Sequence, residues 1–108
     1  MLYAESIAEQ SDPFVERLVD AVARELGIDR AEVRKRNFVP AGDLPYEVDI
    51  LASDGRKVIY DSGDYQAALE KAITAADIAG FEARKKASAD NGLLRGYGLA
   101  SYVEDTGL

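Results

Sequence analysis

The chain has 108 residues, 47% of them hydrophobic, a formal net charge of −7 from 13 basic and 20 acidic residues, and no His, Cys or Trp. Without His and Cys it offers no imidazole base, thiolate nucleophile, disulfide or thiolate-held metal centre. The length suits one domain, the apolar content supports a core, and the acidic balance argues against general attraction to nucleic acid or anionic membranes. No apolar run is long enough to cross a bilayer, so we expect a cytoplasmic protein.

The first helix is expected after a weakly patterned N-terminal segment, residues 1–11. Ser11-Asp12-Pro13 is typical of a helix start, because a side-chain oxygen can cap free N–H groups and proline loses no bond at the first helical position. Gly27 is a suitable helix end. Between them, apolar residues at every third or fourth position predict a helix near 13–26 and the core stripe Phe14, Val15, Leu18, Val19, Val22 and Leu26.

A second, shorter helix is predicted near 29–37. Asp29 and Glu32 have the spacing of a capping box, and Glu32 precedes Arg36 by four residues, which favours an ion pair. Pro40 and Pro45 then break the chain. Alternating apolar and polar residues on both sides of Asp54-Gly55 predict a hairpin near 46–60, with a tight turn in which both central residues tolerate positive φ.

Two more helices and a strand complete the predicted elements. Asp64 caps a helix near 64–79, Gly80 interrupts it, and a helix near 81–90 ends at Asn91-Gly92. A strand is predicted near 94–103. Its two faces carry, in turn, Tyr97, Leu99, Ser101 and Val103, and the smaller Gly96, Gly98, Ala100 and Tyr102. The small face invites close packing by a neighbour. The fold class is α+β, with residues 12–108 as a single unit.

The first two helices also resemble a DNA-binding helix-turn-helix. Ala23, Gly27 and Val33 have the spacing of that motif, and the second helix carries basic residues that could contact DNA: Arg30, Arg34, Lys35 and Arg36. The short second helix, nearby Pro40 and the acidic remainder argue against DNA binding. The alternative function is a free-standing acidic interaction domain. In the DNA-binding form of this alternative, the corner at residues 16–37 would contact the DNA.

Other groups of residues have simpler explanations. The acidic residues near the hairpin could divide acid and base roles, but each has a local task in a turn, a cap or a strand face, and calcium-loop spacing is absent: Glu47, Asp49, Asp54, Asp61 and Asp64. Gly96-Tyr97-Gly98 lacks the third glycine of a phosphate-binding loop. The tyrosines are too scattered to predict a stacking platform. We assign no catalytic, cofactor-binding or metal-binding residue.

Three stretches in series resemble the large, molybdopterin-binding subunit of the xanthine dehydrogenase and aerobic carbon monoxide dehydrogenase family. Together they cover the chain from about residue 16 to its end. The first stretch is Glu16–Asp29, continued by Glu32-Val33-Arg34 and Arg36-Asn37-Phe38 up to Pro40. The second is Tyr60–Tyr65 with Ala68-Leu69, and the third is Arg95–Ala100 with Tyr102, Glu104 and Gly107. Each stretch alone is a weak signal, whereas their order is fairly specific.

The resemblance implies a parent oxidoreductase that hydroxylates or oxidises its substrate at a molybdenum-pterin centre and passes electrons to iron-sulfur and flavin subunits. The segments that contact cofactor and substrate in the family match no position here. The chain is therefore expected to be an internal, structural segment without catalytic residues, inactive and free of molybdenum and pterin when isolated. Because its last strand lacks a partner, we also expect the isolated chain to self-associate through residues 94–103.

Overall fold

The computed structural model describes residues 2–103, with side chains described from residue 14 onward. The described chain contains four α-helices and one two-stranded antiparallel hairpin, which confirms the α+β fold class. The elements are α1 (Leu2–Leu26), α2 (Arg30–Asn37), the 3₁₀ turn η1 (Ala41–Asp43), β1 (Tyr46–Leu51), β2 (Lys57–Tyr60), α3 (Tyr65–Ala75), the 3₁₀ turn η2 (Ile78–Gly80) and α4 (Phe81–Asp90).

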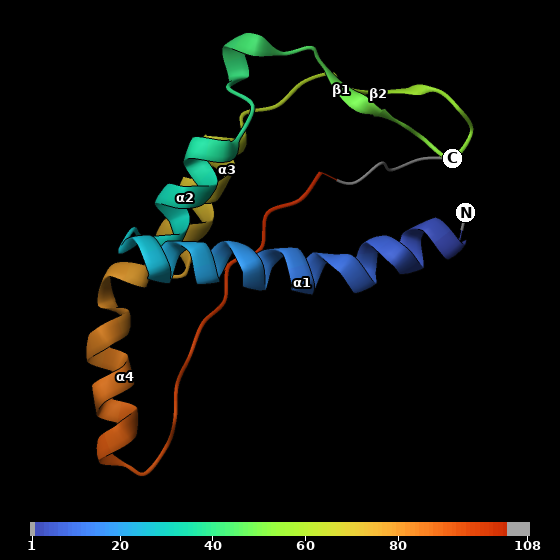
Figure 1. Ribbon diagram of the computed structural model, residues 1–108. Helices are drawn as coiled ribbons and strands as arrows, with labels where there is room; N and C mark the ends of the chain where they lie inside the picture. Colours follow the sequence, from blue (N-terminus) through green and yellow to red (C-terminus); the bar gives the residue numbers. More distant parts are fainter. Residues whose placement is uncertain (1, 104–108) are drawn as a thin grey trace.

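The helices α1, α2 and α3 form the centre of the molecule. Helix α2 packs against both α1 and α3, while the hairpin projects from them and α4 extends on the other side of α1 (Figure 1). The radius of gyration is 16.9 Å, compared with roughly 13 Å for a compact domain of this length. The fold is therefore open, with a small core made by Ala23, Ala31, Val33, Leu69 and Phe81.

Helix α1 is longer than predicted. It begins at Leu2, so the expected helix start at Ser11-Asp12-Pro13 is wrong, and the segment 1–11 is helical in its described part, residues 2–11. Proline has a helical φ but disfavours a helix interior, because it removes one N–H bond and its ring crowds the carbonyl four residues earlier, so α1 continues through position 13 despite this residue. Gly27 ends α1 as predicted, with a left-handed φ of 65°.

The apolar stripe of α1 does not form the core of this chain. Phe14 is 72% exposed, Leu18 57% and Leu26 64%, and Val15 and Val22 are exposed as well. The face turned inward instead carries Glu16, Val19, Asp20 and Ala23. Except at the half-buried Val19, the core prediction for α1 is wrong, because α2 presents an arginine to this helix and the acidic face pairs with it.

The second helix follows its prediction closely. Asp29 is its N-cap, and the Asp29 Oδ1 atom accepts hydrogen bonds from the N–H groups of Ala31 and Glu32 at 2.9 and 3.1 Å. The predicted ion pair between Arg36 and Glu32 is present at 2.9 Å.

The hairpin pairs Tyr46 with Tyr60 and Val48 with Val58, and its register shifts between Val48 and Leu51. Of the two central residues of the predicted turn, Asp54 and Gly55, only Gly55 has positive φ, at 81°. The Ala52 N–H bonds to the Arg56 carbonyl at 2.8 Å, so three residues lie between these two rather than the two of the predicted tight turn.

Helix α3 ends earlier than the predicted 64–79. Asp64 caps it as predicted, accepting a 2.9 Å hydrogen bond from the Ala67 N–H. Asp77 then adopts a left-handed conformation with φ 48°, which ends α3 and starts η2. A short polar side chain makes this conformation accessible to aspartate, and here it accepts a hydrogen bond from the Gly80 N–H.

Residues 94–103 run alongside the helices without pairing to another strand in the described chain, so the predicted strand is not formed there. Figure 1 shows this segment leaving the end of α4 and crossing α1. None of the described helices combines the length and apolarity that crossing a bilayer requires.

Candidate functional site

The most highly connected side chain in the described structure is Arg34 on α2. Only 3% of this side chain is exposed. Its Nε and Nη2 donate to the Oε2 atom of Glu16 at 2.9 and 2.5 Å, and its Nη1 donates to the Oδ1 atom of Asp20 at 2.9 Å. Because both carboxylates belong to α1, one guanidinium fixes the angle between the two helices.

The same cluster also holds the C-terminal segment. The Leu99 carbonyl accepts from Arg34 Nη2 at 3.0 Å, and the Ser101 N–H donates to the Oε1 atom of Glu16 at 3.0 Å. Arg30 lies with its guanidinium carbon 4.2 Å from the centre of the Tyr97 ring and donates to the Tyr97 carbonyl at 3.3 Å. Side chains of α1 and α2 therefore bind the backbone at three alternate residues.

Electrostatics favour the charged form of Arg34. Burial opposes its charge, but the hydrogen bonds that Arg34 donates to Glu16 and Asp20, and then their negative charges, outweigh that cost and raise the pKa of the guanidinium. Every buried side-chain nitrogen and oxygen in the described part of the chain has a hydrogen-bond partner. The buried polar atoms of the cluster therefore bind one another and join α1, α2 and the C-terminal segment.

The α1–α2 corner contains the residues on which the helix-turn-helix interpretation rests. Ala23 and Val33 are buried where α1 meets α2, as that motif requires. The basic residues, however, are engaged within the chain: Arg30 and Arg34 hold the C-terminal segment, Lys35 pairs with Glu70 at 3.0 Å, and Arg36 pairs with Glu32. The α1–α2 corner thus has the spacing of a DNA-binding motif while its charges serve the fold.

The five acidic residues near the hairpin are not brought together as a site. Glu47 pairs with Lys57 at 2.6 Å, Asp54 pairs with Arg56, Asp61 accepts from the Ser62 hydroxyl, and Asp64 caps α3. Hydrogen bonds from the Arg56 backbone and side chain lower the pKa of the Asp54 carboxyl. Within residues 14–103, no three acidic side chains are grouped so that they could hold a metal ion.

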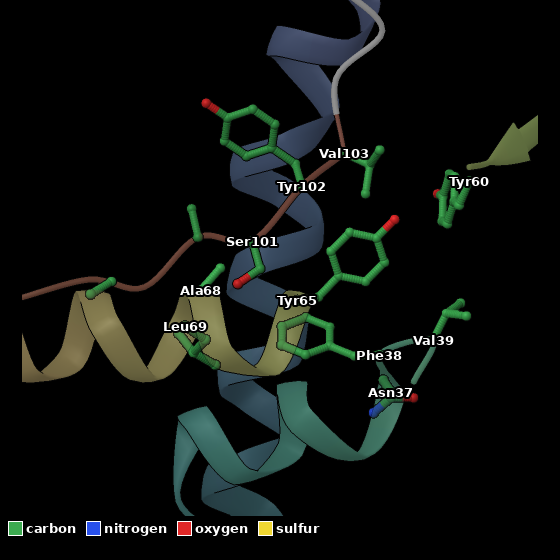
Figure 2. Close-up of a pocket in the computed structure, with 12 residues that line it drawn as sticks. Asn37, Phe38, Val39, Tyr60, Tyr65, Ala68, Leu69, Ser101, Tyr102 and Val103 are labelled. Atoms are coloured by element: carbon green, nitrogen blue, oxygen red, sulfur yellow. The ribbon is translucent and has the colours of Figure 1, made fainter. Parts of the chain in front are cut away.

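An apolar groove of about 420 Å³ lies between the C-terminal segment and α3. Figure 2 shows Tyr65 and Phe38 on one side of it and Ser101, Tyr102 and Val103 on the other. The Tyr65 ring makes edge contacts with Phe38 and Tyr60, at centroid distances of 6.3 and 6.1 Å. A turn and the hairpin separate these aromatic residues in the sequence, so their spacing did not indicate a common site.

The chain is similar in sequence to subunits of two dehydrogenases. The chain is 34% identical over 96 residues to the carbon monoxide dehydrogenase large chain of Hydrogenophaga pseudoflava, covering 86% of this chain and 11% of that protein. It is 30% identical over 95 residues to the 6-hydroxypseudooxynicotine dehydrogenase complex subunit gamma of Paenarthrobacter nicotinovorans, covering 86% of this chain and 12% of that protein. No family model matches the chain.

The fold is also similar to that of a solved dehydrogenase structure. A chain of reconstituted CO dehydrogenase from Oligotropha carboxidovorans superposes with a TM-score of 0.53 and 28% identity, covering 72% of this chain and 9% of that one. The resemblance indicated by the sequence is therefore confirmed: the chain corresponds to a segment of the carbon monoxide and xanthine dehydrogenase family. It spans about a tenth of the length of the relatives it matches.

Proposed function

We propose that this chain is a structural piece of the large subunit of a molybdenum hydroxylase of the carbon monoxide dehydrogenase type. Its role there is to hold helices and an extended segment in fixed relation, through the Arg34 cluster, and to present apolar surfaces to the rest of the subunit. The likeness to a carbon monoxide dehydrogenase large chain and to the gamma subunit of a second dehydrogenase complex supports this assignment.

The observation that carries the proposal is the orientation of α1. Its inner face is acidic and pairs with Arg34, while its apolar stripe is exposed along Phe14, Leu18, Val22 and Leu26. A continuous apolar patch of this kind is typical of a surface that another part of a protein covers. A subunit of which this chain is about a tenth would supply that cover.

The cofactor of such a subunit finds no counterpart among the described residues. Buried polar side-chain atoms are all satisfied within the described chain, and its acidic residues are dispersed in caps, turns and ion pairs. These side chains do not fit a pterin or a molybdenum ligand set, so we derive no catalytic step through that group. Oxidation of the substrate would rest on other parts of the subunit.

The proposed context includes further partners. Flavin and iron-sulfur subunits would accept electrons from the parent enzyme, and the assembly would work in the cytoplasm. The relative from Paenarthrobacter is named as a subunit of a dehydrogenase complex, which supports a multi-subunit assembly.

An antibody against the purified chain provides the test. In cells that express the gene, it should recognise a polypeptide much larger than 11.7 kDa that co-purifies with molybdenum. Recognition of a free 11.7 kDa protein without molybdenum in the same fractions would contradict the proposal. The purified chain alone should contain neither molybdenum nor pterin by elemental analysis and fluorescence, and stoichiometric metal would likewise contradict a purely structural role.

A further inference from the structure

The backbone of residues 97–102 has two edges that differ in hydrogen bonding. In an extended chain, successive residues direct their N–H and C=O groups to opposite edges. The Tyr97 carbonyl, the Leu99 carbonyl and the Ser101 N–H all bind side chains of α1 and α2. On this held edge, three backbone groups at alternate residues therefore bind charged side chains.

The opposite edge consists of Gly98, Ala100 and Tyr102. Among the residues that the structure describes, no hydrogen bond involves their backbone groups, and all three residues are exposed. Gly98 has nothing within 4 Å of where a Cβ would stand, so a neighbouring backbone can approach closely. The segment thus presents an open edge, formed by the unpaired backbone groups of Gly98, Ala100 and Tyr102, while the hydrogen bonds on the held edge fix its position.

The groove described above borders this edge. Ala100 and Tyr102 line it, opposite Phe38, Tyr65 and Leu69. When a peptide adds to a sheet edge, its main chain forms the hydrogen bonds and its alternate side chains enter neighbouring pockets. The open edge offers the first of these features and the groove the second.

We propose that the open edge at Gly98–Tyr102 binds an extended strand from the remainder of the large subunit, with an apolar side chain of that strand in the groove. This deepens the proposed function and rests on it. The matched residues make up only 11% and 12% of the two relatives, so the remainder of a polypeptide of that length would provide the strand. The exposed apolar stripe of α1 indicates the same source, because both surfaces are uncovered in this chain.

Amide hydrogen exchange followed by mass spectrometry tests the proposal. In the molybdenum-containing large subunit, the amides of Gly98, Ala100 and Tyr102 should exchange at least about tenfold more slowly than in the dilute isolated chain. The Ser101 amide, already bound to Glu16, should be protected in both. Equal rates at the open edge in both samples would overturn the proposal while leaving the proposed function intact.

If the antibody finds only the free chain, the proposed function has failed. The same exchange experiment on the free chain still shows whether the open edge binds a strand. Protection of the open edge that rises with protein concentration would identify a second copy as the occupant and overturn the assigned partner. Absence of protection at every concentration would overturn the binding edge itself.

A pair of variants made in the large subunit sharpens the test. Ala100→Pro removes an N–H from the open edge and should reduce the yield of assembled subunit several-fold. Leu94→Pro, at a fully exposed position outside the groove, is the matched control and should leave that yield unchanged. Equal yields for both variants would contradict pairing at Ala100.

Discussion

Glu16 divides its two carboxylate oxygens between two segments: Oε2 binds Arg34 of α2, and Oε1 binds the backbone N–H of Ser101. Arg34 also binds the segment that contains Ser101, because its Nη2 donates to the Leu99 carbonyl. A helix, a second helix and an extended segment thus meet at one buried ion pair. Such a pair is costly to disrupt, because the buried Arg34 charge then keeps only Asp20 as an anionic partner.

Glu16→Gln should therefore lower the stability of the chain. Glutamine preserves shape but lacks the negative charge beside Arg34, whose side chain is 3% exposed. We expect the free energy of unfolding to fall by about 3 kcal/mol, measured by urea titration with far-ultraviolet circular dichroism. Glu25→Gln, on the exposed side of the same helix, is the control. Equal losses for both variants would contradict a special role of Glu16.

Gly27 is expected to be required for its backbone conformation alone. Its φ is 65°, and a Cβ built there meets nothing within 4 Å, so Gly27→Ala should cost about 1 kcal/mol from left-handed strain. Gly42→Ala has equal space and no positive φ, and should be neutral or slightly stabilising. Urea unfolding of both variants measures the difference, and equal effects would be the contrary result.

The Lys35–Glu70 pair should make the α2–α3 contact sensitive to acid. Hydrogen bonds from Gln66 and Lys35, and the charge of Lys35, lower the pKa of the Glu70 carboxyl. A carboxyl with a lowered folded-state pKa stabilises the fold above its unfolded pKa, and that contribution is lost as pH falls through the folded pKa. Glu70→Gln should therefore reduce stability slightly at neutral pH and lose this difference in acid. A difference that persists unchanged in strong acid would refute the assignment.

The isolated chain should self-associate through residues 94–103. Its open edge and the neighbouring apolar groove have no cover in this chain, and unpaired strand edges associate readily. Sedimentation velocity should show a rising average mass with concentration, and Ala100→Pro should suppress that rise while Leu94→Pro should not. A monomer at every concentration would exclude this mode of association.

The chain should not bind duplex DNA. Its candidate contact residues are occupied: Arg34 is buried, Arg30 covers the Tyr97 ring, and Lys35 pairs with Glu70. At low salt, a labelled duplex should migrate unchanged with the chain present. A salt-dependent shift, abolished by Arg36→Gln at the exposed end of the corner, would instead support the helix-turn-helix interpretation.

Local features of the fold followed directly from neighbouring residues. Asp29 and Asp64 cap the helices they were expected to cap, and Gly27 and Gly55 take positive φ where the chain turns. These outcomes depend on contacts within a few residues, which is why spacing reveals them. The start of α1 at Leu2 was missed because a cap-and-proline pattern also occurs where a helix simply continues.

Composition and spacing were enough to predict the helices, the hairpin, the absence of imidazole and thiol chemistry, and the family resemblance. Which face of α1 turns inward depends on long-range contacts, and the inner face is that of Glu16 and Asp20 rather than that of Leu18. Periodicity identifies an apolar stripe but not what covers it. The partner of the inner face is set by a residue distant in sequence, here Arg34, whereas the apolar outer face is left exposed by the described residues.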